Sequence, residues 1–333
     1  MHKKKKILII TNGSNKVGMG HIYRSISIAK ALKEKNIDVC FSISKNKNIE
    51  NKLRKIGKCY LTNFDQKSQL KQISQINPDI IIIDLLKKFL PYKENFWKKI
   101  TILCKKIITI DYDGKELQYV DIAFNPLFKS KFVAKKNFSG INYCPIRNEF
   151  VNKRKKYKVN KNVESILIIQ GGADTKCFIP KILSSLKAIP DKIKISIIVG
   201  SEFKCKKELK TSIKKIGRTV IVLEDVKKIA KEMNKHDLII TSAGVTLIEI
   251  LTIGIPSIII SAEKHELENA ERISRKKAAL SLGYGKELSQ KKIQQSVEKI
   301  IFNYKVRKKL YNNSRKIVDG NGLERIIKIV TKE

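Results

Sequence analysis

Short apolar segments recur along the first half of this chain, and stretches with helical spacing separate them. Residues 6–11, 38–42, 79–84, 106–111 and 120–124 each have the length and the apolar character of a buried strand. Between the first two, residues 20–35 place Ile22, Ile26, Ala29 and Leu32 on one helix face. This alternation predicts an α/β fold with a doubly wound, mainly parallel sheet.

A second series of the same kind follows a polar, basic stretch at residues 148–162. Its strand-like segments are residues 165–170, 194–199, 219–223, 238–241 and 257–261, with a helix predicted at 244–252. Residues 289–330 are lysine-rich and have the spacing of amphipathic helices. We therefore predict an N-terminal domain at 1–147, a basic linker at 148–162, and a C-terminal domain at 163–333 that includes the terminal helices.

The composition is that of a globular chain. Hydrophobic residues make up 42% and charged residues 30% of the 333 positions, which excludes wholesale disorder. No apolar run approaches the roughly 18 to 20 residues that a membrane span needs. The apolar segment after the first lysines is too short for a signal peptide. We expect a soluble, cytoplasmic protein with no transmembrane segment.

The net charge of +39, from 70 basic and 31 acidic residues, has two explanations. One is a face for nucleic acid or for an anionic membrane. The other is nucleotide bias in the genome, since Lys, Ile and Asn dominate together and the lysines are spread along the chain. Spread charge with few aromatic residues favours the second. We expect no specific nucleic-acid partner, a preference for anionic ligands such as nucleotide diphosphates, and loose membrane association as an open option. No feature of the sequence indicates an oligomeric state.

The cysteines carry no metal or redox motif. No two of the six are closer than 19 positions, so no C-x-x-C pair exists. Most lie beside apolar residues, and we interpret them as small core residues in a reducing compartment. They are Cys40, Cys59, Cys104, Cys144, Cys177 and Cys205.

The first functional motif, VGMGHIYR at residues 17–24, follows the first strand and opens the first helix. Gly18 and Gly20 permit a tight turn, and the helix N-terminus offers free N–H groups to an anion. His21 would face the carboxyl end of the sheet, the usual crevice of open α/β folds, and could take a proton there. The third glycine of a dinucleotide fingerprint is replaced by Tyr23. An ordinary turn with a surface histidine fits the spacing equally well.

Two more motifs follow strands of the second half. In QGGAD, Gly171 and Gly172 would let the backbone approach a phosphate, or would form a plain turn. In TSAGVTLIE, small residues precede a helix, a pattern suited to a diphosphate. The alternative for this motif is N-capping by a hydroxyl, with the glutamate solvated. Its candidate residues are Ser242, Ala243, Gly244, Thr246 and Glu249, and Glu249 could hold a ribose diol.

A polar loop, EKHELENA, follows the next strand. His265 and Asn269 lie one helical turn apart and could both touch a sugar, although an exposed charged helix start fits as well. Asp84, Asp111 and Asp113 end or follow strands, where they face the same sheet edge or cap turns. No metal-binding constellation is evident.

Together these motifs, in this order, resemble the family that joins the nucleotide-sugar hydrolase of pseudaminic acid biosynthesis to the spore-coat polysaccharide glycosyltransferase-like proteins. The resemblance covers nearly the whole chain. GMGHIYR is similar to the family's G-x-G-H-x-x-R signature, and YCPIRNEF at 143–150 is similar to the segment before the family's second domain. The other family-like segments are QGGAD, SAGVTLIE, GIP and DGNGLER at 319–325.

The resemblance implies a GT-B fold, with two Rossmann-like domains facing a central cleft and UDP held mainly by the second. It implies that His21 is the general base that directs water at the anomeric carbon, releasing UDP with inversion. It also implies that neither a metal nor a cofactor is required. Under this resemblance, Gly171, Gly172 and the SAGVTLIE residues bind UDP. The sugar-side candidates are Gly18, Gly20, Arg24, Lys264, His265 and Asn269.

Two departures from the family pattern concern the sugar side. Leu85–Leu86 follow Asp84 where the hydrolase carries His-Tyr, and Lys264–His265 stand where it carries Asn-Gln. The nucleotide half of the site therefore resembles the family more closely than the sugar half. We expect hydrolysis of a UDP-activated diacetamido-trideoxy sugar in nonulosonic acid or surface polysaccharide biosynthesis. The alternatives are an inverting UDP-sugar glycosyltransferase of the spore-coat type, and a nonenzymatic nucleotide-sugar-binding or RNA-binding protein.

Overall fold

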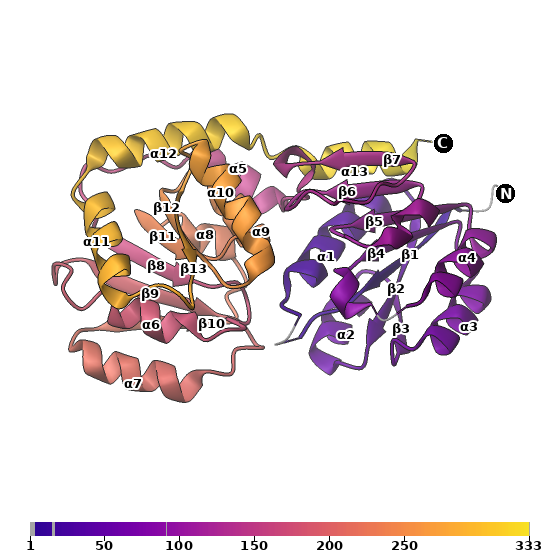
Figure 1. The fold of residues 1–333 in the computed structure, drawn as a ribbon, viewed down its shortest axis with the longest axis horizontal. Coiled ribbons are helices and arrows are strands. Elements are labelled where there is room, and N and C mark those ends of the chain that lie inside the picture. Colours follow the sequence, from indigo (N-terminus) through magenta and orange to yellow (C-terminus); the bar gives the residue numbers. More distant parts are fainter. Residues whose placement is uncertain (1–3, 15–16, 91, 333) are drawn as a thin grey trace. The chain divides into compact units, whose positions relative to one another are not determined.

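The computed structural model describes residues 4–14, 17–90 and 92–332, which form two compact units (Figure 1). Unit 1 contains the described residues up to 13, residues 21–145, and those from 321 onward. Unit 2 contains the described residues of 14–20 and residues 146–320. Two segments thus group differently from the domains predicted above. The loop before His21 joins unit 2, and the last helix joins unit 1.

The centre of unit 1 is a seven-stranded parallel sheet in the order β3-β2-β1-β4-β5-β6-β7. Its strands are β1 (Lys6–Thr11), β2 (Asp38–Ser44), β3 (Lys58–Thr62), β4 (Ile80–Asp84), β5 (Lys106–Ile110), β6 (Ile122–Asn125) and β7 (Lys136–Ser139). The inner strands are buried on both faces, which is why β4 is a continuous isoleucine run rather than an alternating pattern.

Helices cover this sheet. They are α1 (Gly20–Lys33), α2 (Lys47–Arg54), α3 (Gln66–Ile76), α4 (Glu94–Leu103) and the C-terminal α13 (Gly322–Thr331), with short 3₁₀ turns η1 (Lys87–Phe89), η2 (Lys115–Tyr119) and η3 (Ile141–Tyr143). α13 packs beside η3, and its first residue lies against the chain at Cys144: a Cβ on Gly322 would stand 2.0 Å from the Cys144 carbonyl oxygen. This close approach explains why α13 belongs to unit 1.

Unit 2 repeats the architecture with a six-stranded parallel sheet in the order β10-β9-β8-β11-β12-β13. The strands are β8 (Ser165–Ile169), β9 (Lys194–Val199), β10 (Val220–Glu224), β11 (Leu238–Thr241), β12 (Ser257–Ser261) and β13 (Leu280–Tyr284). In each unit the strand order reverses once, between β1 and β4 and between β8 and β11. Open α/β sheets bind ligands at the carboxyl ends of the strands beside such a reversal.

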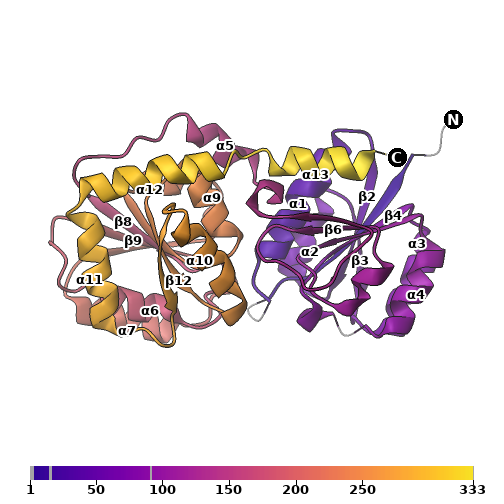
Figure 2. The same cartoon turned by 45° about the horizontal axis from the view of Figure 1, so that its top comes forward.

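The helices of unit 2 include α12, which packs against α9 (Figure 2). They are α5 (Asn148–Arg154), α6 (Phe178–Ser184), α7 (Lys206–Ile216), α8 (Ile229–Met233), α9 (Val245–Ile253), α10 (Leu267–Arg275), α11 (Gln290–Ile301) and α12 (Tyr304–Ile317), with the 3₁₀ turn η4 (Lys264–Glu266). No helix in the described part of the chain has both the length and the apolar character that crossing a membrane demands.

The stretch predicted as a basic linker is a packed part of unit 2. It begins with α5, and Phe150 and Tyr157 are buried. The Arg154 guanidinium donates to the carbonyl oxygens of Thr252, Val318 and Arg315. The segment is polar because it is amphipathic and its Arg154 bonds to main-chain oxygens. It is not a solvated connection between the units.

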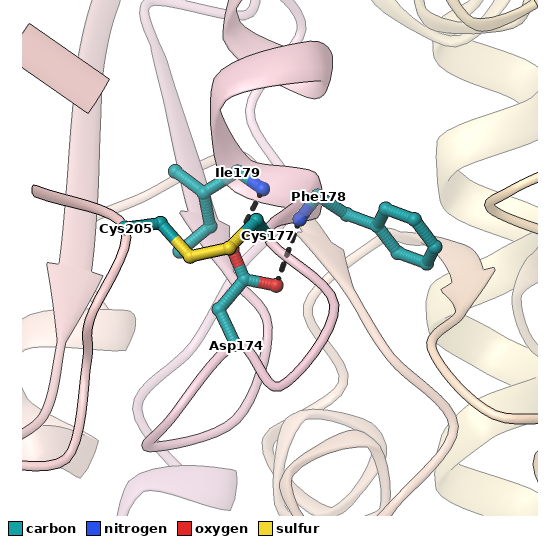
Figure 3. Close-up of a disulfide and its surroundings, with 5 residues drawn as sticks. All are labelled: Asp174, Cys177, Phe178, Ile179 and Cys205. Carbon is teal, nitrogen blue, oxygen red and sulfur yellow. Dashed lines mark hydrogen bonds between the residues drawn. A yellow bond between two sulfur atoms is a disulfide. The ribbon is translucent and has the colours of Figure 1, made fainter. Parts of the chain in front are cut away.

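The interpretation of most cysteines as small core residues in a reducing compartment did not foresee a disulfide. Cys177 and Cys205 form a disulfide (Figure 3). They are 28 positions apart, but each directly precedes a helix, α6 or α7, and these helices pack together, so the two Cα atoms lie 5.8 Å apart. Cys40, Cys59 and Cys144 are buried and Cys104 is partly buried, and these four are not part of a disulfide in the described structure.

Candidate active site

His21 in the first turn of α1 lies beside Asp84, the last residue of β4. Its Nδ1 is 2.8 Å from Oδ1 of Asp84. An ionised carboxylate only accepts hydrogen bonds, so Nδ1 of His21 donates to Asp84 and Nε2 lies outside this hydrogen bond. The Asp84 side chain is fully buried, whereas that of His21 is 12% exposed. The bond to Asp84 therefore fixes the orientation of the His21 ring, and Nε2 is the ring nitrogen that can act as a base.

Asp84 is held ionised by its neighbours. Nε of Arg24 donates to both carboxylate oxygens at 3.1 and 3.0 Å, and Ser25 Oγ donates at 3.1 Å. Burial raises the pKa of Asp84, but the Arg24 charge and the hydrogen bonds from His21 and Arg24 outweigh it, so this pKa lies below its ordinary value. Nη2 of Arg24 also lies 3.2 Å from His21 Nδ1, but it has its acceptor in Asp84.

A second carboxylate completes the cluster. Nη1 of Arg24 bonds to Asp111, whose other oxygen accepts from the Leu127 N–H at 3.3 Å. Burial lowers the pKa of Arg24, but Asp84 and Asp111 together raise it above its ordinary value. The Arg24 side chain is 1% exposed. The arginine of the first motif thus lies next to His21 and bonds to protein carboxylates, so its place is beneath the site rather than on its surface.

Gly18 shapes the loop before α1. Its backbone is left-handed, at φ +82°, and its N–H donates to the Ser14 carbonyl at 2.7 Å. A side chain would be strained in this conformation, so the turn depends on glycine. Gly20 opens α1 itself.

In unit 2, the start of α9 has no side-chain cap. The N-cap residue is Gly244, which has no side chain to accept from the first N–H groups of the helix. Capping by a hydroxyl at this position, the alternative considered above, is therefore not what the structure has. The Leu247 N–H donates to the Gly244 carbonyl oxygen at 3.1 Å, and the positive end of the helix dipole at such a start favours a phosphate. Ser242 and Ala243 are buried, and Thr246 is partly exposed.

Side chains from the η4–α10 segment hold the loop before α9. Oε2 of Glu266 accepts from the Ala262 N–H at 2.7 Å and from the Ala243 N–H at 3.4 Å. The buried Asn269 donates to the Ala243 carbonyl at 2.8 Å. Burial raises the pKa of Glu266 despite these bonds. Lys264 and His265, from the same segment, are exposed. Of this segment, Asn269 and Glu266 therefore position the loop.

Glu249 on α9 forms an ion pair with Arg147. Nε and Nη2 of Arg147 donate to its two carboxylate oxygens at 2.8 and 3.0 Å. Glu249 is buried, and burial raises its pKa against the opposing effect of Arg147. The sequence singled out Glu249 but not Arg147, although Arg147 lies inside the family-like YCPIRNEF segment.

The QGGAD loop follows β8. Gly171 is left-handed at φ +67°. Asp174 bonds to the first N–H groups of α6, accepting from Phe178 and Ile179 at 2.9 Å each (Figure 3). The start of α6 is thus occupied by the protein's own carboxylate, in contrast to α9.

Two buried polar side chains stand at the strand reversal of unit 2. Neither amide atom of Gln170 has a hydrogen-bond partner among the described residues, nor does the Thr241 hydroxyl. Gln170 follows β8, and Thr241 ends the neighbouring β11, in register with Ile169. Buried groups of this kind cost free energy unless water or a ligand bonds to them. Across the described residues, no three His, Cys, Asp or Glu side chains form a group that could hold a metal.

Comparison with known proteins finds similarity to glycosyltransferase-related sequences. Residues 165–328 match the family model of the glycosyltransferase family 28 C-terminal domain. The spore coat polysaccharide biosynthesis protein SpsG of Bacillus subtilis is 26% identical over 335 residues, covering 97% of this chain and 96% of that protein. The uncharacterized protein MJ1062 of Methanocaldococcus jannaschii is 32% identical over 271 residues, 77% of this chain. The aligned part is 55% of MJ1062, so the chain spans about half of that relative.

Solved structures share the fold. MurG of Acinetobacter baumannii superposes with a TM-score of 0.72 at 14% identity, covering 99% of this chain and all of that one. MnaA of S. aureus, solved with UDP, gives a TM-score of 0.68 at 12% identity, covering 98% of this chain and 96% of that one. The fold of two Rossmann-like domains with parallel sheets is therefore GT-B, as the sequence predicted.

Proposed function

We propose that this chain, which is similar over nearly its whole length to the spore-coat polysaccharide protein SpsG, is an inverting enzyme that transfers a sugar from a UDP-sugar in polysaccharide biosynthesis. The observation that carries the proposal is the His21–Asp84 pair at the strand reversal of unit 1, with a free Nε2 and a buried ionised partner. UDP is the nucleotide proposed because the structurally similar MnaA was solved with UDP.

In this mechanism His21 is the general base. An acceptor hydroxyl gives its proton to Nε2 while its oxygen bonds to the anomeric carbon of the sugar. The bond from that carbon to the diphosphate oxygen breaks, and UDP leaves with the electron pair. Attack from the face opposite the leaving group inverts the anomeric configuration. Asp84 holds the ring in the right tautomer and stabilises the imidazolium that forms, the role a carboxylate plays in His–Asp pairs generally.

Unit 2 supplies the diphosphate site in the proposal. The open N–H groups at the start of α9, with Gly171 and Gly172 after β8, would bond the departing diphosphate, and the helix dipole would offset its charge. Fixed dipoles of this kind can replace a metal ion at a leaving group. Glu249 would bind the ribose hydroxyls through the lone pairs that Arg147 leaves unused, since a carboxylate offers about four acceptor positions.

Hydrolysis is the second candidate. Water would take the place of the acceptor hydroxyl, with the same base and the same leaving group. The observation in its favour is the segment 143–150, YCPIRNEF, which resembles the hydrolase branch of the family. Its substrate would be a UDP-activated diacetamido-trideoxy sugar. The residues at Leu85–Leu86 and Lys264–His265 depart from that branch on the sugar side.

The test is UDP release from a panel of UDP-linked acetamido sugars, with the anomeric proton followed by NMR in the same samples. Each sugar is assayed alone and with candidate acceptor saccharides, for wild type and His21→Gln. Release that needs both His21 and an acceptor, with an inverted product, supports transfer. Release without acceptor that depends on His21 supports hydrolysis instead. Wild-type rates in His21→Gln would reject both.

A further inference from the structure

The arginines and the lysines of α12 lie in different surroundings. The helix carries four lysines and two arginines and no acidic residue. Arg307 is buried and donates to the carbonyl oxygens of Ile300 and Ile301, and Arg315 donates to that of Arg154. The lysines take no part in this internal bonding. All four, Lys305, Lys308, Lys309 and Lys316, are exposed.

The end of α10 extends this surface. Asn313 on α12 donates to the Lys277 carbonyl at 3.1 Å, so the two segments lie in contact. Arg275, Lys276 and Lys277 are exposed. Among the described residues, no carboxylate forms an ion pair with any cation of this surface. We call these seven cations the basic face: three lie at the end of α10 and just after it, and four are the lysines of α12.

The basic face is hollowed along α12. An open depression of about 350 Å³ is lined by the four lysines together with Tyr304 and two asparagines. Polar and aromatic side chains between the cations leave room for anionic groups to approach several ammonium ions at once.

An apolar side chain stands at the N-terminal end of the same helix. Phe302 is 71% exposed, directly before the N-cap Asn303, whose side chain accepts from the Val306 N–H at 3.0 Å. Burying this ring would be favourable, whereas water surrounds it in the free protein. Phe302 thus has an exposed ring directly before the N-cap of the helix that carries the four lysines.

We propose that the basic face, with Phe302, binds the surface of a membrane rich in anionic lipids, reversibly and without crossing it. A 14-residue helix is about 21 Å long, so its lysines can meet several headgroups of a flat surface together. Anionic membranes attract such cations over roughly a Debye length, and an aromatic ring suits the boundary between headgroups and acyl chains.

Nucleic acid fits this surface less well. Single-stranded binding uses a series of exposed aromatic side chains on which bases stack, whereas here Phe302 is exposed and Tyr304 and Tyr311 are partly buried. The two arginines of α12, whose planar forks suit phosphate diesters, bond inward, so Arg275 is the one arginine that we assign to the basic face. Lysine ammonium groups act as point charges, which suits the diffuse charge of a lipid surface. The proposal is independent of the proposed function, since it uses none of its residues.

The experiment must separate the basic face from the general lysine content of the chain. The test variant is K305Q/K308Q/K309Q/K316Q. The matched control is K207Q/K210Q/K214Q/K215Q, which removes the same number of exposed lysines from α7, another helix of unit 2. A third variant, Phe302→Ser, keeps every charge. Circular dichroism and thermal unfolding confirm that each variant is folded.

Binding is measured by co-sedimentation with vesicles of phosphatidylcholine containing 30% phosphatidylglycerol, and with phosphatidylcholine alone, at low and physiological salt. A fluorescent 30-nucleotide RNA is titrated in parallel. We expect affinity for the anionic vesicles to fall at least ten-fold in the α12 variant, two- to five-fold in Phe302→Ser, and less than two-fold in the α7 control.

Two results would overturn the proposal. Equal losses in the α12 and α7 variants would mean that net charge alone drives vesicle binding. Loss of RNA binding in the α12 variant, with vesicle binding unchanged, would assign the face to nucleic acid. UDP-sugar turnover without vesicles should be the same in all three variants, so failure here and failure of the proposed function remain distinguishable.

Discussion

Nδ1 of His21 and Oδ1 of Asp84 lie 2.8 Å apart, although the two residues are 63 positions apart in the chain. The strand reversal of unit 1 brings them together, because β1 and β4 are neighbours and Thr11 pairs in register with Asp84. A short loop joins the end of β1 to the start of α1. A histidine in its first turn therefore reaches the end of β4.

Replacing the base should remove catalysis without removing nucleotide binding. His21→Gln keeps a donor for Asp84 but has no basic nitrogen. We expect turnover to fall by about 10²- to 10⁴-fold, the usual contribution of a general base, while UDP affinity stays within a few-fold. Steady-state UDP release and calorimetric titration with UDP measure the two quantities. Full activity in this variant would take His21 out of the mechanism.

Arg24 should matter for stability through the two carboxylates it bonds. Arg24→Met leaves Asp84 and Asp111 buried without their cation, and we expect the free energy of unfolding to fall by about 3 to 5 kcal/mol. The control is Arg54→Met, the same substitution in an exposed pair with Glu50, which should cost less than about 1 kcal/mol. Urea unfolding at pH 7 compares them, and equal losses would contradict the role of burial.

Glu249 should contribute to UDP affinity. If it binds the ribose, Glu249→Ala should weaken UDP binding by about 1.5 to 3 kcal/mol, the value of a lost hydrogen bond to a charged group. Glu149→Ala is the control, because Glu149 also pairs with Arg147, at 3.0 Å. Calorimetry should find the control near wild type. Similar losses in both variants would show that the effect passes through Arg147.

Asp174 should make stability depend on pH. Burial, opposed by the N–H bonds from Ile179 and Phe178, raises the pKa of Asp174 from 3.8 to about 6. The folded state therefore holds a proton that the unfolded state has lost between these values. The contribution of Asp174 to the free energy of unfolding is greatest below pH 3.8, and it declines by about 3 kcal/mol as the pH rises to 6. Asp174→Asn should abolish the decline.

Urea unfolding of wild type and Asp174→Asn at pH 4, 5, 6 and 7 gives the comparison. The variant's stability relative to wild type should increase across that range. Asp191→Asn serves as the control, since the Asp191 side chain is 95% exposed, and its difference from wild type should stay constant. A constant difference for Asp174→Asn as well would contradict the raised pKa.

The disulfide should stabilise unit 2. It closes a segment of 28 positions, and cross-links of that length typically contribute about 2 to 4 kcal/mol. Cys177→Ser/Cys205→Ser should lose this amount in chemical unfolding. Reduced wild type should match the variant, and a reducing agent should leave the variant unchanged. If the agent leaves wild type unchanged too, the bond adds nothing to stability.

The inner strands were predictable from sequence because burial on both faces makes them continuous apolar runs. Three strands were missed: β3, β7 and β13. All three lie at sheet edges, where one side is exposed and the apolar pattern is broken. In β7 only Phe138 is even partly buried, and β13 contains a glycine. The edge strand β10 was predicted, because its residues 220–223 form a continuous apolar run, whereas these three strands depend on pairing with a neighbour.

The candidate site was predictable to the extent that its residues follow strands. The motifs located His21, Arg24 and Glu249, and Asp84 stood out as a strand end. Their partners were not predictable, because Arg147 lies 102 positions from Glu249. Glu266 stands beside His265 in the sequence, but only the fold shows that its carboxylate bonds to the Ala262 and Ala243 N–H groups.

Unit 1 begins first in the chain, but unit 2 is the first whose residues are all synthesised. Unit 1 contains the first strand and also α13, whose Ile326, Ile327 and Val330 are buried. Unit 2 lies wholly between these parts. During synthesis, unit 2 can therefore close while the earlier unit still lacks a helix. A fragment that ends before Gly322 would leave the first sheet without that cover, so unit 1 is built from both ends of the described chain.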